Sequence, residues 1–170
     1  MKYNLEHLTQ EPSQMVLGPI QDDEALVLFS IIKTCVFKRI VEIGGLRGYS
    51  AKNFLESVGT DGTVYTVDIT NLTPISPNHI TIIKSVDRVV KDDIKDRVDM
   101  VFFDCHDYNS SLSFFNNMVE SGIIDDETIL VLHDTNLHYE NTTGGSFYNG
   151  VGWVHQPAER DLSNHFFDIG

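Results

Sequence analysis

Residues 39–68 constrain the fold of this chain more than any other segment. The apolar run Val41-Glu42-Ile43 leads into a glycine-rich stretch, Gly44-Gly45-Leu46-Arg47-Gly48. A second apolar run, Thr63 to Asp68, ends in a carboxylate 24 residues after Gly44. This order is typical of a strand, a tight turn, a helix and a second, parallel strand. Glycines at the turn allow close approach of the backbone where a Cβ would collide.

Chains with this pattern usually hold a nucleoside ligand at the carboxyl ends of parallel strands. The dinucleotide fingerprint G-x-G-x-x-G is absent, because Glu42 stands two residues before Gly44 and the next spaced glycine is Gly48. A carboxylate at the end of the strand would repel a pyrophosphate, so Glu42 favours a cationic or amine-bearing ligand. Asp68, at the end of the second strand, would accept two hydrogen bonds from a ribose diol.

The rest of the chain continues to alternate between apolar runs and helical segments. We expect an α/β, doubly wound, mostly parallel sheet with helices on both faces. We expect one domain over residues 1–170, with an N-terminal extension at 1–20 and a loop at 139–155 over the carboxyl edge of the sheet. The expected strands are 39–43, 63–68, 80–84, 98–103, 128–132 and 165–169, and the expected helices are 22–36, 50–57, 86–93, 112–121 and 156–162.

Composition excludes several classes of partner. The net charge of −13 argues against nucleic acid and against an anionic membrane surface. The two cysteines, Cys35 and Cys105, lie in apolar contexts and favour a reducing compartment. The N-terminus is polar and lacks the apolar core of a signal peptide. We therefore expect a soluble cytoplasmic protein.

The run from Val41 to Ala51 resembles motif I of the class I S-adenosylmethionine-dependent methyltransferases. Within that class it looks like the catechol O-methyltransferase-like branch, methyltransferase family 24, in which an E-x-G-x-x-x-G-x-S run is usual. The resemblance implies a Rossmann-like methyltransferase sheet. It also implies a final antiparallel pair of strands, which we expect to be shortened because the chain ends after the first of them. The implied activity is O-methylation of a small molecule or a sugar hydroxyl.

The resemblance also implies that S-adenosylmethionine is the cofactor. Its amino-acid end would lie near Glu42, its ribose near Asp68 and its adenine beside the residues that follow the third strand. The expected cofactor contacts are Glu42, Gly44, Gly45, Gly48, Tyr49, Ser50, Asp68, Ile69, Ser85, Val86 and Asp104.

Two further apolar strands end in acids and imidazoles. Phe102-Phe103 is followed by Asp104 and His106, and Leu130-Val131-Leu132 is followed by His133 and Asp134. In the class I order these strands are neighbours, so Asp104 and Asp134 would face each other across a site for Mg²⁺ or another divalent cation. In the family pattern an Asn follows the second acid, whereas here Thr135 follows it. The candidate catalytic residues are Asp104, His106, His133 and Asp134, with His106 or His133 taking the acceptor proton.

Other interpretations of these residues stay open. Asp104 could cap the following helix, His133 could form a structural pair with Asp134, and His138 could be solvent-exposed. A metal-dependent oxidase or hydroxylase built from Asp104, His133, Asp134 and His138 is one alternative function. A non-catalytic nucleoside-binding module is another. An uncovered sheet edge would also allow a homodimer.

Overall fold

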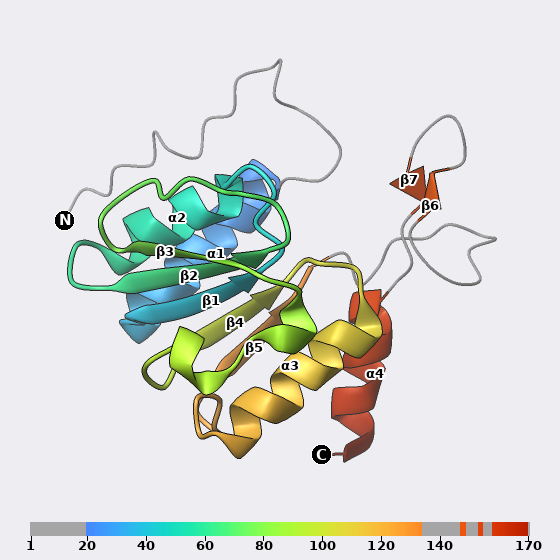
Figure 1. Ribbon diagram of the computed structural model, residues 1–170. Coiled ribbons are helices and arrows are strands. Elements are labelled where there is room, and N and C mark those ends of the chain that lie inside the picture. Colours follow the sequence, from blue (N-terminus) through green and yellow to red (C-terminus); the bar gives the residue numbers. More distant parts are fainter. Residues whose placement is uncertain (1–19, 134–146, 149–152, 155–157, 170) are drawn as a thin grey trace.

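The core of the molecule is a five-stranded parallel sheet (Figure 1). The computed structural model describes residues 20–133, 147–148, 153–154 and 158–169. The strand order is β3-β2-β1-β4-β5. The strands are β1 Arg39–Ile43, β2 Thr63–Asp68, β3 His79–Ile83, β4 Met100–Phe103 and β5 Ile129–Leu132. The chain order reverses between β1 and β4, so their carboxyl ends flank the switch point at which open α/β sheets bind ligands.

Helices cover both faces of this sheet, which confirms the predicted doubly wound fold (Figure 1). On one face, α1 Asp22–Cys35 and α2 Tyr49–Val58 pack against Ile40, Val64 and Phe102. On the other face, α3 Tyr108–Glu120 and α4 Ala158–Ile169 pack against residues that include Val41, Ile43 and Phe103. Successive strand residues point to opposite faces. Glu42 and Thr66 therefore project to the α1–α2 face.

Helix α1 forms where the sequence predicts a helix over 22–36. Three acids fill its first turn, where the helix dipole stabilises negative charge. One of them, Glu24, accepts a hydrogen bond at Oε2 from the backbone N–H of Gln21 at 2.7 Å. The helix ends at Cys35, because Val36 adopts a left-handed conformation with φ 59°.

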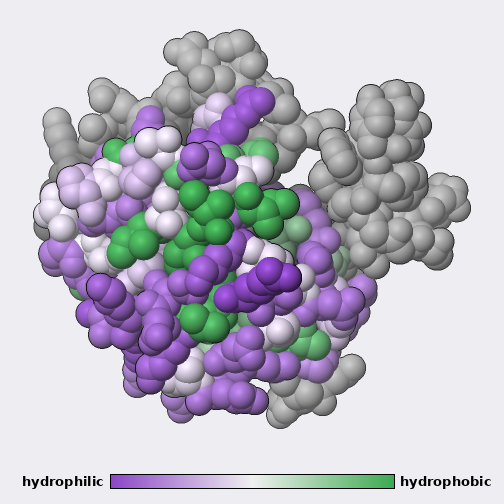
Figure 2. Space-filling model, viewed as in Figure 1, coloured by the Kyte–Doolittle hydropathy of each residue, from purple (hydrophilic) through white to green (hydrophobic). Residues whose placement is uncertain are grey.

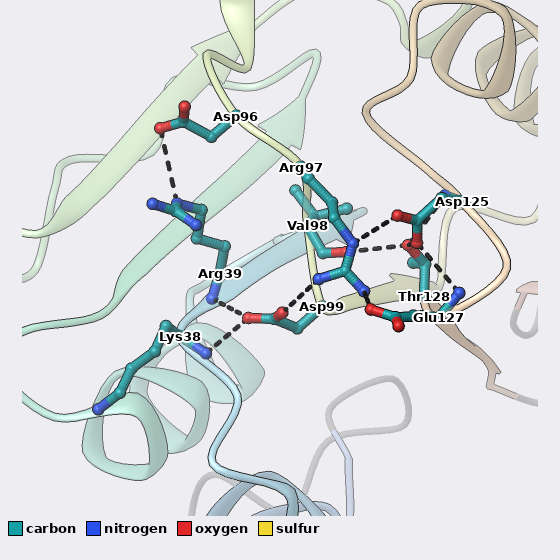
Figure 3. Close-up of polar contacts among 9 residues, drawn as sticks. All are labelled: Lys38, Arg39, Asp96, Arg97, Val98, Asp99, Asp125, Glu127 and Thr128. Atoms are coloured by element: carbon teal, nitrogen blue, oxygen red, sulfur yellow. Dashed lines mark hydrogen bonds and ion pairs between the residues drawn. The ribbon is translucent and has the colours of Figure 1, made fainter.

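A charged network ties together the amino ends of β1, β4 and β5 (Figure 3). Asp99 Oδ2 accepts the backbone N–H groups of Lys38 at 2.7 Å and Arg39 at 2.8 Å. The Arg97 guanidinium contacts three carboxylates at 2.6–3.1 Å, those of Asp99, Asp125 and Glu127. This network lies at the strand ends opposite the candidate site, so its role is to hold the starts of the strands.

The prediction of one helix over residues 86–93 is wrong. The structure has two short 3-10 helices there, Val86–Arg88 and Lys91–Asp93. Val89 and Val90 between them are extended, as suits β-branched residues. Asp93 fixes the break, because its side chain accepts the N–H of Val90 at 3.0 Å and pairs with Lys84.

The prediction of a strand over residues 165–169 is also wrong, because these residues belong to α4. The aromatic run His165-Phe166-Phe167 suggested a strand, but burial follows a helical period. Leu162 is buried in the core, Phe166 one turn later packs on Phe115 with ring centroids 4.7 Å apart, and Phe167 is 83% exposed. In the part of the chain that the structure describes, the main sheet therefore has no antiparallel strand at its C-terminal end.

The two edges of the described sheet are β3 and β5. Ile80 and Ile83 on β3 are exposed, and Figure 2 shows apolar residues gathered in the middle of the face viewed in Figure 1. Most of the predicted loop 139–155 lies outside the described residues. Within it the structure gives only the antiparallel pair β6 Phe147–Tyr148 and β7 Trp153–Val154. No helix in the described ranges is long and apolar enough to cross a membrane.

Candidate active site

The glycine turn between β1 and α2 packs directly on its neighbours. Gly44 has φ +93°, and a Cβ there would lie 2.3 Å from the backbone oxygen of Asp104. A Cβ at Gly45 would lie 2.1 Å from Thr66 Cγ2. Gly48 has φ +78° and is the N-cap of α2. The turn therefore needs these glycines for the fold itself, in addition to any ligand that they admit.

Glu42 lies beneath this turn and is fully buried. Its Oε2 accepts the hydroxyl of Thr66 at 2.7 Å, and its Oε1 accepts the hydroxyl of Ser50. Loss of solvation raises the Glu42 pKa to about 7; the hydroxyls of Ser50 and Thr66 oppose this rise, and the charges of Asp104 and Asp68 add to it. A cation placed beside the carboxylate would reverse that rise, so the site favours a positively charged ligand.

Asp68, at the end of β2, holds the same turn from the other side. Its Oδ2 accepts the backbone N–H groups of Gly45 at 3.0 Å and Leu46 at 2.9 Å. Its Oδ1 accepts the N–H and the hydroxyl of Thr70, both at 2.7 Å. Burial raises the pKa of Asp68, but these hydrogen bonds outweigh burial and hold the pKa below its usual value. Four donors match the acceptor capacity of a carboxylate, so a ribose diol would have to replace or share one of them.

Asp104 and the two predicted imidazoles come together beyond β4 and β5. His133 Nδ1 lies 3.0 Å from Asp104 Oδ1, and His106 Nε2 lies 3.6 Å from the same oxygen. The register pairs Phe103 with Leu132, which places the two strand ends side by side. An imidazole oriented by a carboxylate is the usual arrangement for moving a proton to or from a substrate hydroxyl.

Two glutamates extend this group, and sequence reasoning missed both. Glu159 on α4 is buried; its Oε1 accepts the backbone N–H of His106 at 2.8 Å, and its Oε2 lies 3.1 Å from His106 Nδ1. His106 has φ +54°, an uncommon conformation that this contact holds. Glu24 on α1 lies 3.4 Å from His133 Nε2. Glu24 stands among the acids of the first turn of α1, which accounts for it without a site, and no local pattern links residue 159 to residue 106.

Four other predicted cofactor contacts lie at the start of α2, directly after β2 and after β3. Tyr49 begins α2, and Ile69 is 75% exposed directly after Asp68. Ser85 bonds Asp87, while Val86 is buried in the core on the α3 side. The alternative that Asp104 caps the next helix is wrong, because Asp107 is the N-cap of α3 and accepts the N–H of Ser110 at 3.0 Å.

The described residues include only one of the two predicted metal ligands, Asp104. Within them, no group of three or more His, Cys, Asp or Glu side chains is arranged to hold a metal ion. The predicted partner Asp134 and the alternative ligand His138 lie outside those residues. Asp104, the first predicted ligand, offers its Oδ1 to His133.

Comparison with family models and with curated proteins finds no match. Solved structures do match. The SAH-bound methyltransferase PaMTH1 of Podospora anserina has 18% identity and a TM-score of 0.59, over 77% of this chain and 61% of that one. A putative caffeoyl-CoA O-methyltransferase from Staphylococcus aureus has 19% identity and a TM-score of 0.53, over 66% of this chain and 57% of that one.

The fold is therefore that of the class I methyltransferases, as the resemblance of the glycine turn implied. The match spans less than two thirds of the length of either neighbour. Likeness at this level of identity establishes the fold, whereas an activity depends on the residues of the site.

Proposed function

We propose that this chain binds S-adenosylmethionine and transfers its methyl group to an oxygen atom of a small molecule or sugar. The observation that carries this proposal is Glu42. A fully buried carboxylate lies under a glycine turn at the switch point of the sheet, and its raised pKa reflects burial with no cation among the described groups that act on it. A ligand with ammonium and sulfonium groups would supply the missing positive charge.

Other residues around the turn would contact the ribose and the adenine of the cofactor. Asp68 would accept the ribose hydroxyls in place of Thr70, which occupies its Oδ1 in this structure. Ile69 offers exposed apolar surface directly beside Asp68 for the adenine ring. S-adenosylmethionine, when bound, supplies a methyl group activated by the sulfonium. The protein contributes mainly by positioning donor and acceptor in line.

The acceptor hydroxyl would lie beside Asp104, where His106 and His133 converge. One imidazole takes the proton that the hydroxyl loses, and Asp104 stabilises the imidazolium that results. Glu159 fixes the backbone of His106 and so sets where that ring can reach. A divalent cation, if one binds, would be held by Asp104 and Asp134 and would orient the hydroxyl.

Calorimetry with S-adenosylhomocysteine tests the cofactor proposal. We expect micromolar affinity, on the order of −8 kcal/mol. A matched pair of variants localises the binding. Asp68→Ala removes a carboxylate at the turn, whereas Asp61→Ala removes the exposed partner of Lys38. Binding that is weakened by the first variant and not by the second supports the proposal. Absence of heat and of a thermal shift at millimolar ligand contradicts it.

A second assay separates an enzyme from a binding module. Labelled S-adenosylmethionine is incubated with catechols and with sugars, and methyl transfer is measured for the native chain, for His133→Gln and for His106→Gln. An enzyme loses turnover in at least one of the two variants while S-adenosylhomocysteine still binds. A module that binds the ligand and transfers no methyl group to either class of acceptor contradicts the catalytic part of the proposal.

A further inference from the structure

A buried chain of hydrogen bonds runs from Glu42 away from the glycine turn to the edge strand β3. Thr66 Oγ1 lies 2.7 Å from Glu42 Oε2 and 2.9 Å from His79 Nε2. The other ring nitrogen, His79 Nδ1, accepts the backbone N–H of Ile75 at 3.1 Å. Glu42, Thr66 and His79 are all buried, with 3% exposure or less. Neither Thr66 nor His79 is among the predicted site residues.

The hydrogen bond between Ile75 and His79 fixes the direction of the other hydrogen bonds in this series. A backbone N–H can only donate, so Nδ1 of His79 must be an acceptor. Burial lowers the pKa of His79 and favours the neutral ring, which then carries its hydrogen on Nε2. Nε2–H donates to Thr66 Oγ1, and the Thr66 hydroxyl is left to donate to Glu42 Oε2. Oε2 is therefore held as an acceptor.

We propose that His79 is a positioning residue for the cofactor site, which acts through Thr66 to hold the Glu42 carboxylate in one hydrogen-bonded state and to link it to the loop after β2. This inference rests on the proposed function, because it assigns His79 to the ligand that Glu42 would bind. The hydrogen bonds of His79 run to Thr66 and Ile75, neither of which is a predicted cofactor contact.

The loop of residues 69–78 provides the link. It starts directly after Asp68, and Ile75 in it anchors His79 through its backbone N–H. The side chains of the same loop lie against the turn, because a Cβ at Gly48 would meet Ile75 Cδ1 at 3.0 Å and Leu72 Cδ1 at 3.6 Å. A ligand that displaces this loop on the ribose side therefore also disturbs the hydrogen bonds that orient Glu42.

A consequence is that binding of a cationic ligand is linked to a proton. Because the hydrogen bonds of Thr66 are fixed in direction and Ser50 is outside that series, a proton on Glu42 is placed on Oε1, which then donates to Ser50 Oγ in place of accepting its hydroxyl. In the part of the chain that the structure describes, the charged groups that act on Glu42 are Asp104 beyond β4 and Asp68 at the end of β2, and both disfavour its ionisation. A cation at the turn favours ionisation, so the proton leaves Oε1 for the solvent when the ligand binds near neutral pH.

The test begins without ligand, by following the side-chain carboxyl carbon of Glu42 by NMR through a pH titration. Glu42→Gln identifies the signal. Thr66→Val should raise the titration midpoint by about one pH unit, because a hydrogen bond to the charged form is lost. His79→Ala should raise it as well, although His79 does not contact Glu42. Thr66→Ser and His79→Gln keep a hydroxyl and a donor, and should stay near the native midpoint.

Thr81→Val is the matched control. Thr81 pairs with Thr66 in the β2–β3 register and lies outside the hydrogen-bonded chain described here. Thr81→Val replaces the same hydroxyl by a methyl group as Thr66→Val does, but on the adjacent strand. A midpoint that moves with Thr66→Val and His79→Ala but not with Thr81→Val supports the proposal. A native midpoint in His79→Ala overturns it, and so does an equal movement in all three variants.

Calorimetry in buffers of different ionisation enthalpy then counts protons exchanged on binding S-adenosylhomocysteine at pH 7. The native chain should release a fraction of a proton, and Glu42→Gln should release none. His79→Ala should bind roughly fivefold more weakly than the native chain. Binding with no proton exchange overturns the linkage but leaves the proposed function intact. No binding to the native chain overturns the proposed function, while the ligand-free titration still decides the role of His79.

Discussion

Thr70 donates both its backbone N–H and its hydroxyl to Oδ1 of Asp68, each at 2.7 Å. Asp68 therefore has an internal partner in the position that a ribose hydroxyl would take. Under the proposed function, the hydroxyl of Thr70 would compete with a ribose hydroxyl for Oδ1 of Asp68, which both would use as their acceptor.

The two residues should thus respond differently to substitution. Asp68→Ala should weaken binding of S-adenosylhomocysteine by roughly tenfold or more, because it removes hydrogen bonds to a charged acceptor. Thr70→Val should leave the affinity unchanged or raise it. Calorimetry on both variants measures this difference. Equal weakening in both would show that Asp68 holds the loop and does not contact the ribose.

Gly44→Ala should destabilise the chain even without ligand. The new Cβ would lie 2.3 Å from a backbone oxygen of Asp104, which cannot move without disturbing the end of β4. Left-handed strain and overpacking together should cost about 3 kcal/mol or more. Gly122→Ala is the control, since Gly122 has φ +70° but nothing lies within 4 Å of its Cβ position. It should cost only about 1 kcal/mol, and urea unfolding of the pair separates packing from strain.

Glu42 makes stability depend on pH in a defined window. Its pKa is about 7 in the folded protein against an ordinary 4.5, so the folded state holds the proton more tightly. The resulting stabilisation is complete below pH 4.5 and is lost as pH rises through 7, by about 3 kcal/mol at most. His79, whose pKa is lowered, acts in the opposite direction as pH falls below 6.5.

Comparison with Glu42→Gln isolates the Glu42 contribution, because the amide does not titrate. Urea unfolding at pH 5 and pH 8 should show the native chain losing stability relative to the variant as pH rises. Parallel behaviour of the two proteins at both pH values would mean that Glu42 is already ionised, or is less deeply buried, at pH 5.

The divalent cation remains a prediction that concerns Asp104 and Asp134. If both acids hold the ion, Mg²⁺ at ten times its dissociation constant should stabilise the folded chain by about 1.4 kcal/mol. Asp134→Asn should abolish that effect and leave the unfolding curve without metal unchanged. Thermal unfolding with and without Mg²⁺ measures both. An equal Mg²⁺ effect in the native chain and the variant would place the ion elsewhere.

Much of the fold could be predicted from local pattern. The apolar runs that became β1 and β2, the glycine turn and the acids of α1 each carry a short-range signal. The errors arose where local pattern was ambiguous. Phe166 and Phe167 are favourable in a strand, and only the packing of Phe166 on Phe115 makes their helical placement evident.

The site was predictable only in part. Residues at strand ends, such as Asp104 and His133, could be brought together because the strand order implies it. Glu159 and His79 reach their partners from elements 53 and 13 residues away, respectively. Such contacts depend on how α4 and the loop before β3 pack, and a single sequence carries no periodic signal for them.

The most direct test of the central claim is a map of backbone amide shifts on addition of S-adenosylhomocysteine. If the ligand binds at the carboxyl ends of β1 and β2, saturable shifts should concentrate at residues 44–50 and 68–70. The amides of Lys38, Arg39 and Asp99, at the opposite ends of the strands, should stay unchanged. Absence of saturable shifts, or shifts centred on that opposite end, would contradict the account.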